Sequence, residues 1–213
     1  MMKQERASRT RHALLTAAAG EFDRRGYAGA SLAGIARAAD ISLGALTFHF
    51  ASKQELSTAV REQGIAATRA LVARVTARRE PPVECVVSLT LGLVELLERD
   101  ASVRAAARLD REAADTRHSW RGAWAPLIRR RLRATADSES CPETDAAALT
   151  ALAVHLVCGM EATLPHRSCP DSEHRTSALL ARIWRQVLPQ AAPKGCGGDI
   201  DEPTPLPARA LRT

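Results

Sequence analysis

Apolar residues recur three or four positions apart along most of the chain, and alternation of apolar and polar residues bounded by turns is absent. This pattern predicts an all-α fold. The first expected helix ends at Gly26, and two short helices follow within residues 31–50. The later helices are expected at 53–79, from Val83 to Leu97, at 103–111 and at 119–136. A long helix that ends near Leu164 and a last helix around residues 180–187 complete the pattern.

Residues 31–50 predict two short helices joined by a tight turn. Ser31 and Ser42 stand where N-caps belong, and Asp40 between them tolerates a left-handed backbone. The pattern fits a helix-turn-helix, and its spacing alone fits an ordinary helical hairpin as well. In the first case the second helix would begin with small or apolar residues that let its backbone approach DNA, namely Ser42, Leu43, Gly44 and Ala45.

The segment that follows favours the helix-turn-helix. The run GALTFHFASKQEL, with FDRRGYAGASLAGIA before it, resembles the N-terminal domain of the TetR family of transcriptional regulators. The family pattern G-x-L-Y-x-H-F-x-S-K-x-x-L is matched at Gly44, Leu46, His49, Phe50, Ser52, Lys53 and Leu56. Within that family the chain resembles the γ-butyrolactone autoregulator receptors and the related pseudo-receptors.

The resemblance implies a set of DNA-contacting residues, with two departures from the family. Thr47 replaces a tyrosine that usually contacts phosphate, and Leu43 stands where the butyrolactone receptors commonly have lysine. The expected DNA-binding residues are Ser31, Ser42, Leu43, Gly44, Ala45, Thr47, His49 and Lys53.

The tryptophans are the second candidate site, since aromatic residues make up only 3% of the chain. By periodicity, Trp120 and Trp124 fit a helical core. The resemblance implies instead that Trp124, followed eight residues later by Leu132, lines an effector cavity. The expected ligand-binding residues are Trp124, Trp120, Val87, Leu91 and Ile128.

The last two helices carry apolar stripes that fit burial within one protomer or between two. The resemblance implies a four-helix dimer interface, with Leu152, Leu156, Gly159, Met160, Leu180, Ile183 and Val187 as the expected contacts. A dimer would present two recognition helices to a near-palindromic operator.

Composition changes along the chain suggest its division into domains. Pro81-Pro82 should end the fourth helix, and after Pro189 the sequence turns to proline, glycine and charged residues. We expect a DNA-binding domain at 1–52 with its helix-turn-helix at 31–50, a connecting helix at 53–80, a ligand-binding and dimerisation domain at 81–188, and a disordered tail at 189–213.

Charge and hydropathy fit a cytoplasmic DNA-binding protein. The net charge of +6 and the isoelectric point near 9.5 favour an anionic partner such as double-stranded DNA. We find neither a run of 18 apolar residues nor a signal peptide, because the apolar segment from Ala13 to Ala19 is too short. The expected partners are therefore an operator, a small-molecule effector and a second copy of the chain, with no membrane.

The function expected from these observations is a ligand-responsive repressor without a cofactor, a metal or an enzymatic activity. One alternative is a thiol- or metal-responsive repressor on the same scaffold, in which scattered histidines and cysteines would act: His155, Cys158, His166, Cys169 and His174. Another is an all-α enzyme, although the nearby acidic residues Asp110, Glu112 and Asp115 fit a solvated face better than a catalytic pair.

Overall fold

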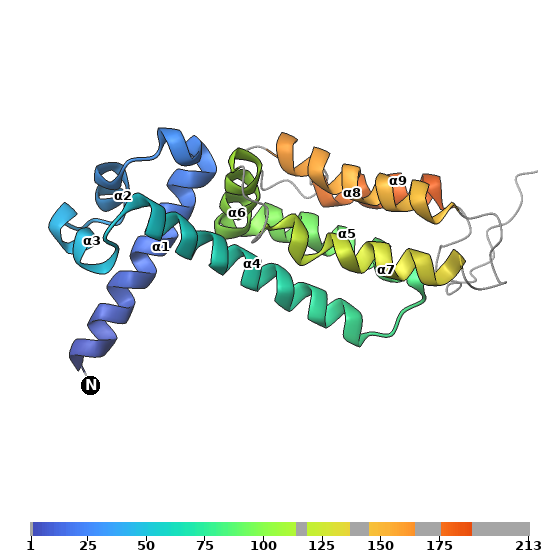
Figure 1. Cartoon of the computed structure of the whole chain (residues 1–213), viewed down its shortest axis with the longest axis horizontal. Coiled ribbons are helices and arrows are strands. Elements are labelled where there is room, and N and C mark those ends of the chain that lie inside the picture. Colours follow the sequence, from blue (N-terminus) through green and yellow to red (C-terminus); the bar gives the residue numbers. More distant parts are fainter. Residues whose placement is uncertain (1, 114–118, 137–144, 165–175, 189–213) are drawn as a thin grey trace, which may run out of the picture.

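The computed structural model describes residues 2–113, 119–136, 145–164 and 176–188 of the 213-residue chain, and all regular elements in these ranges are helices (Figure 1). The expected all-α fold is therefore confirmed. The helices are α1 Met2–Gly29, α2 Leu32–Ala38, α3 Leu43–His49, α4 Lys53–Ala77, α5 Pro82–Arg99, α6 Ala101–Glu112, the 3-10 turn η1 Arg121–Ala123, α7 Ala125–Ala136, α8 Ala146–Thr163 and α9 Thr176–Val187. The expected tail at 189–213 lies outside the described residues.

Local capping sets the ends of the short helices, as the sequence predicts. The hydroxyl oxygen of Ser31 accepts the N–H of Gly34 at 3.1 Å, and that of Ser42 accepts the N–H of Ala45 at 3.1 Å. Asp40 adopts φ 54° between the two helices. The helix-turn-helix geometry is thus encoded within a few residues of each turn.

Helix α1 begins at Met2 and continues past the expected end. The basic residues Arg6, Arg9 and Arg11 therefore lie in the first part of this helix, which projects beyond α2 and α3 (Figure 1). At its other end Gly26 interrupts the helix with φ 67°, and a further turn continues to Gly29. The predicted end at Gly26 is therefore a kink, and the helix ends at Gly29 instead.

Helix α7 starts later than the expected residue 119. Pro126 lacks an N–H, and its ring would clash with the carbonyl four residues before it inside a continuous helix. The chain instead forms the η1 turn, and α7 begins at Ala125, which places the proline in the first turn where it is tolerated. Both tryptophans of this segment therefore precede α7.

Two hydrophobic cores meet at α6. The first joins α1, α2, α3 and the start of α4, and it includes Ala105 and Leu109 of α6. The second fills the space between the later helices and includes Ala106 and Ala107 of α6. One helix is thus buried in both the head, residues 2–60, and the body that follows, so a shift of α6 disturbs both cores.

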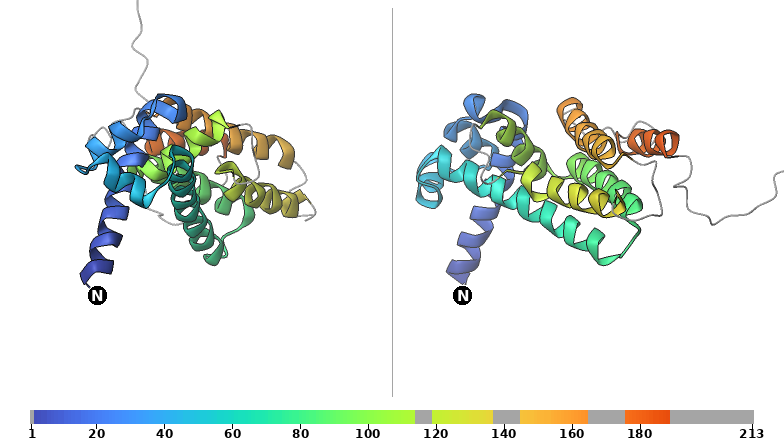
Figure 2. Two further views of the ribbon diagram at one scale, coloured as in Figure 1. Left: turned by 60° about the vertical axis from the view of Figure 1, so that its left-hand side comes forward. Right: turned by 45° about the vertical axis from the view of Figure 1, so that its right-hand side comes forward.

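Helices α8 and α9 lie on the side of the body opposite α4 (Figures 1 and 2). By length and composition alone, α8 is apolar enough to cross a membrane, and only a small part of it is buried within the protomer. The exposure of this apolar helix within a single protomer therefore needs an explanation.

Candidate nucleic-acid interface and effector site

Helix α3 presents an open surface to solvent. A Cβ atom added at Gly44 would meet no atom of the described structure within 4 Å, so the backbone is accessible there. Leu46, by contrast, is fully buried and holds the helix against α2 and α1. The first turn of α3 can therefore approach a partner closely, as recognition helices do in the major groove.

Phe48 is the most exposed large apolar side chain of this surface and was missing from the residues predicted to bind DNA. It is 86% exposed, and Leu43 on the same helix is 48% exposed. Apolar side chains of this kind contact thymine methyl groups in the major groove. The signal was present in the sequence, because a phenylalanine two positions after the buried Leu46 falls on the opposite side of the helix.

The remaining residues predicted on this surface lie at or beside the two short helices. Thr47 is exposed and donates its hydroxyl hydrogen to the Gly44 carbonyl at 3.1 Å, while the ring of His49 packs edge-on against Phe48. Ser31 and Ser42 use their oxygens as caps and keep their O–H donors available. Ala45 is partly exposed. Their contacts with DNA stay predictions.

Lys53 has a structural role that the sequence did not indicate. Its ammonium donates to the carbonyls of Tyr27 at 2.9 Å and Ala30 at 3.0 Å, and it lies 4.5 Å from the centre of the Tyr27 ring. These contacts satisfy carbonyls at the end of α1. Because a lysine has three N–H donors, only one is left for the phosphate contact that we predicted.

Ion pairs fasten α6 to α1. The Arg104 guanidinium donates to the Asp23 carboxylate at 2.8 Å in a largely buried pair, and Arg108 donates to the Asp23 carbonyl at 2.7 Å. At the kink of α1, the N–H of Tyr27 donates to Glu112 at 2.7 Å. The head is therefore held by the same helix that enters the core of the body.

The expectation of a solvated acidic face is wrong for Asp110, which is largely buried, whereas Glu112 is exposed but still contacts α1. Asp110 lies 3.4 Å from Arg61 of α4 and accepts the backbone N–H groups of Trp120 and Arg121. Burial raises the pKa of Asp110, although these N–H groups and Arg61 act in the opposite direction. Asp115 lies outside the described residues.

The three tryptophans are buried to a similar degree but differ at their N–H groups. Trp120 donates to Thr68 of α4 at 3.0 Å, and Trp184 donates to Thr90 of α5 at 2.9 Å. The rings of Trp120 and Trp124 meet edge to face, with centroids 5.4 Å apart. Trp124 is 0% exposed, and its N–H has no hydrogen-bond partner among the described residues. A ligand oxygen could accept this buried donor.

The other residues predicted to bind ligand share the core of the body with these rings. Ile128 is fully buried, whereas Val87 and Leu91 are partly buried against the same core. Val87 and Leu91 stand one turn apart on α5, so they lie on one side of that helix. Their contact with an effector stays a prediction.

The predicted dimer contacts divide into buried and accessible positions. Met160 and Leu180 belong to the core of the protomer. Leu152, Leu156 and Ile183 are half-buried, Gly159 is open, and Val187 is 41% exposed. Leu179, which we did not predict, is 50% exposed and lies one turn before Ile183. An apolar surface thus runs along α8 and α9.

The cysteines of the described part lack the environment of reactive thiols. Burial raises the pKa of Cys158 and of Cys85, which disfavours the thiolate. The described residues contain no group of three or more histidines, cysteines and acids that could hold a metal ion. His166, Cys169 and His174 of the alternative site lie outside those residues.

Known proteins resemble both halves of this architecture. A family model described as bacterial regulatory proteins, tetR family, matches residues 14–60. The A-factor receptor protein of Streptomyces griseus is 27% identical over 198 residues, which cover 92% of this chain and 68% of that protein. The crystal structure of a γ-butyrolactone receptor, an ArpA-like protein, superposes with a TM-score of 0.70 and 29% identity over 89% of this chain and 91% of its own.

A third relative was solved on DNA. CprB from Streptomyces coelicolor, in complex with its biological operator sequence, has a TM-score of 0.62 and 29% identity over 85% of this chain and 99% of its own. Its likeness, like that of the receptors, extends through the head and the body. Residues 14–60 therefore match the TetR family of bacterial regulators, and the chain as a whole is similar to the γ-butyrolactone receptors.

Proposed function

We propose that the protein is a ligand-responsive transcriptional repressor that binds a near-palindromic operator as a homodimer in the cytoplasm. The observation that carries this proposal is the buried N–H of Trp124, which has no hydrogen-bond partner among the described residues. This N–H lies in a body that shares α6 with the DNA-binding head. The similarity to a protein solved with its operator and to γ-butyrolactone receptors supports it.

DNA binding would use the exposed side of α3. Gly44 lets the backbone come close, and Leu43 and Phe48 offer apolar contacts to thymine methyl groups. The helical arm at the start of α1 carries exposed Arg6 and Arg9, which can neutralise phosphates. Sequence preference would therefore depend on shape and methyl groups more than on charged contacts to bases.

Dimerisation would cover the apolar surface of α8 and α9. Leu152 and Leu156 on α8, with Leu179, Ile183 and Val187 on α9, are only partly covered within the protomer. This accounts for a helix as apolar as α8 in a protein that we propose to be soluble. Two protomers related by a twofold axis would place their recognition helices on half-sites one helical turn or a multiple of it apart.

The effector would bind in the body against Trp124, with Trp120, Ile128, Val87 and Leu91 as the other predicted contacts. An indole offers a broad apolar face and one donor, which suits a mostly apolar metabolite with a few oxygens. A γ-butyrolactone-type signal fits this description. An antibiotic-like metabolite, as bound by pseudo-receptors, fits it too. Basic members of this group often resemble the pseudo-receptors, so the isoelectric point near 9.5 favours that kind of ligand.

Coupling between the two sites would run through α6. Asp110 of α6 accepts the N–H groups of the turn that carries Trp120, and the same carboxylate faces Arg61 of α4. A movement of the tryptophans would therefore displace α6. At the end of the same helix, Glu112 holds the kink of α1. By linkage, an effector that weakens DNA binding must itself be bound more weakly by the DNA-bound protein.

The test is a release assay on operator DNA isolated by selection from genomic fragments. Protein bound to labelled operator is titrated with synthetic γ-butyrolactones and with antibiotic-like metabolites, and the fraction of bound DNA is followed by fluorescence anisotropy. We expect at least one class to release the parent, and Trp124→Phe to need a higher concentration although it binds the operator equally well. Equal release of a folded Trp124→Phe protein would remove Trp124 from the site.

A further inference from the structure

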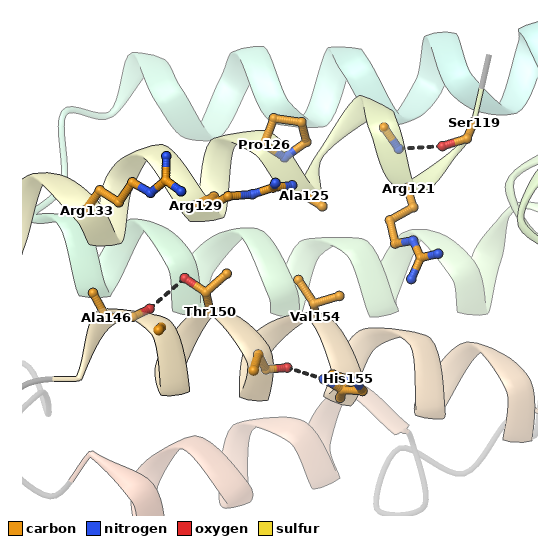
Figure 3. A pocket seen from close by; sticks show the side chains of 13 residues that line it. Ser119, Arg121, Ala125, Pro126, Arg129, Arg133, Ala146, Thr150, Val154 and His155 are labelled. Atoms are coloured by element: carbon orange, nitrogen blue, oxygen red, sulfur yellow. Dashed lines mark hydrogen bonds between the residues drawn. The ribbon is translucent and has the colours of Figure 1, made fainter. Parts of the chain in front are cut away.

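A groove of about 720 Å³ runs between α7 and α8 and is separate from the tryptophan core (Figure 3). Its volume lies within the roughly 300–1,000 Å³ typical of small-molecule sites. Ile128 and Leu132 lie buried on the core-facing side of α7. Arg129 and Arg133, each one residue further on, line the groove. The groove therefore uses a side of α7 that the proposed effector site does not use.

The groove also uses a side of α8 that is free of the proposed dimer contacts. Thr150, Val154 and His155 line it, together with small alanines. At 3.6 residues per turn, Thr150 and Val154 fall on the side of α8 away from Leu152 and Leu156, and His155 lies between the two sides. A ligand in the groove and a second protomer on α8 can therefore be accommodated together.

The lining combines an apolar surface with positive charge. Ala125, Pro126 and Val154 supply apolar surface, and Arg121, Arg129 and Arg133 stand along the α7 side (Figure 3). None of the described residues that line the groove is acidic, and no ion pair joins these three arginines to another described residue. A guanidinium pairs with carboxylate or phosphate through parallel N–H donors.

We propose that this groove binds an amphipathic organic anion, whose apolar body lies along Ala125, Pro126 and Val154 and whose acid group pairs with Arg129 and Arg133. The inference goes beyond the proposed function, because it requires neither DNA binding nor an effector at Trp124. The shared chemistry is an acid group on an apolar chain, and a carboxylate and a phosphate monoester are its two natural sources.

The test is isothermal titration calorimetry on the full chain with decanoate, decyl phosphate, 1-decanol and acetate, all below their micellar concentrations. We expect decanoate or decyl phosphate to bind with a stoichiometry of one per protomer, and the neutral alcohol and the short acid to bind at least about tenfold more weakly. The stronger of the two long-chain acids identifies the acid group that the groove prefers.

Matched substitutions locate the site. Arg129→Gln together with Arg133→Gln should weaken binding of the long-chain acid by about tenfold or more, while Arg130→Gln, an exposed neighbour outside the groove, should leave it unchanged. Ala151→Phe, at an exposed position that lines the groove, should abolish binding of acid and alcohol alike.

The proposal is overturned if decanol binds as tightly as both acids, or if the double substitution binds the acid like the parent. Operator binding is measured on the same samples. A protein that binds decanoate in the groove but selects no DNA would contradict the repressor and leave this inference intact, and the reverse result would contradict only the groove.

Discussion

Replacing each tryptophan by phenylalanine tests the difference between their N–H groups. The substitution replaces an indole by a smaller phenyl ring at each of the three positions, and each indole is almost completely buried. Trp120→Phe removes a hydrogen bond to Thr68, and Trp184→Phe removes one to Thr90. Trp124→Phe removes a donor that has no partner in the described part of the chain.

The expected magnitude follows from this contrast. A satisfied hydrogen bond contributes about 1 kcal/mol to the free energy of unfolding, whereas a buried unsatisfied donor costs about 1–3 kcal/mol. The loss from the smaller ring is common to all three variants and cancels in their comparison. The free energy of unfolding of Trp124→Phe should therefore exceed that of Trp120→Phe and of Trp184→Phe by about 2–4 kcal/mol.

The assay is urea unfolding followed by circular dichroism, because the substitutions change the fluorescence. Protomer concentration is kept equal, since dimerisation adds to apparent stability. Equal losses at all three positions would refute the reasoning, because they would mean that the Trp124 N–H is satisfied in the free protein. In that case an effector oxygen would gain nothing from it.

Further substitutions address the other sites. Gly44→Leu should not lower the melting temperature, since a Cβ there meets no atom within 4 Å and leucine favours a helix more than glycine does, yet it should abolish operator retention in a mobility-shift assay; retained binding would show that α3 does not approach DNA closely. Lys53→Ala should lower the free energy of unfolding by about 1–3 kcal/mol through the uncapped end of α1, as measured in urea, and an unchanged value would contradict the capping role. Leu179→Glu should shift the protein towards monomer in sedimentation velocity, and an intact dimer would exclude this part of α9 from the interface. Burial raises the pKa of Glu161 above its ordinary 4.5. The neutral carboxyl therefore contributes its full stability below pH 4.5, and this contribution is lost as the pH rises through the raised pKa. The free energy of unfolding of the parent, relative to that of Glu161→Gln, should fall as the pH rises from 4.5 through the raised pKa, and a difference that stays constant with pH would contradict this prediction.

Elements set by neighbouring residues could be predicted from the sequence. The caps at Ser31 and Ser42 and the left-handed Asp40 involve partners at most three positions away. Helical periodicity likewise predicted α4 to α6 within a few residues. The start of α7 was missed because periodicity was followed through Pro126, whose backbone requirement is local and was visible.

Features that depend on distant partners could not be predicted. Lys53 caps a helix that ends more than twenty residues earlier, and Asp110 acts through Arg61, forty-nine positions away. The sequence suggested Trp124 through its resemblance to a family, but burial and partners alone distinguish its N–H from those of Trp120 and Trp184. The groove between α7 and α8 gave no signal, because its arginines and alanines are separated along the chain.

The most direct test of the repressor is selection of genomic DNA fragments by the purified full chain, followed by sequencing of the bound fraction. The account predicts one enriched near-palindromic motif, with half-sites separated by one helical turn or a multiple of it. It also predicts that Gly44→Leu enriches nothing. A bound fraction without any enriched motif, from a folded and dimeric parent, would contradict the assignment of this protein as a sequence-specific repressor.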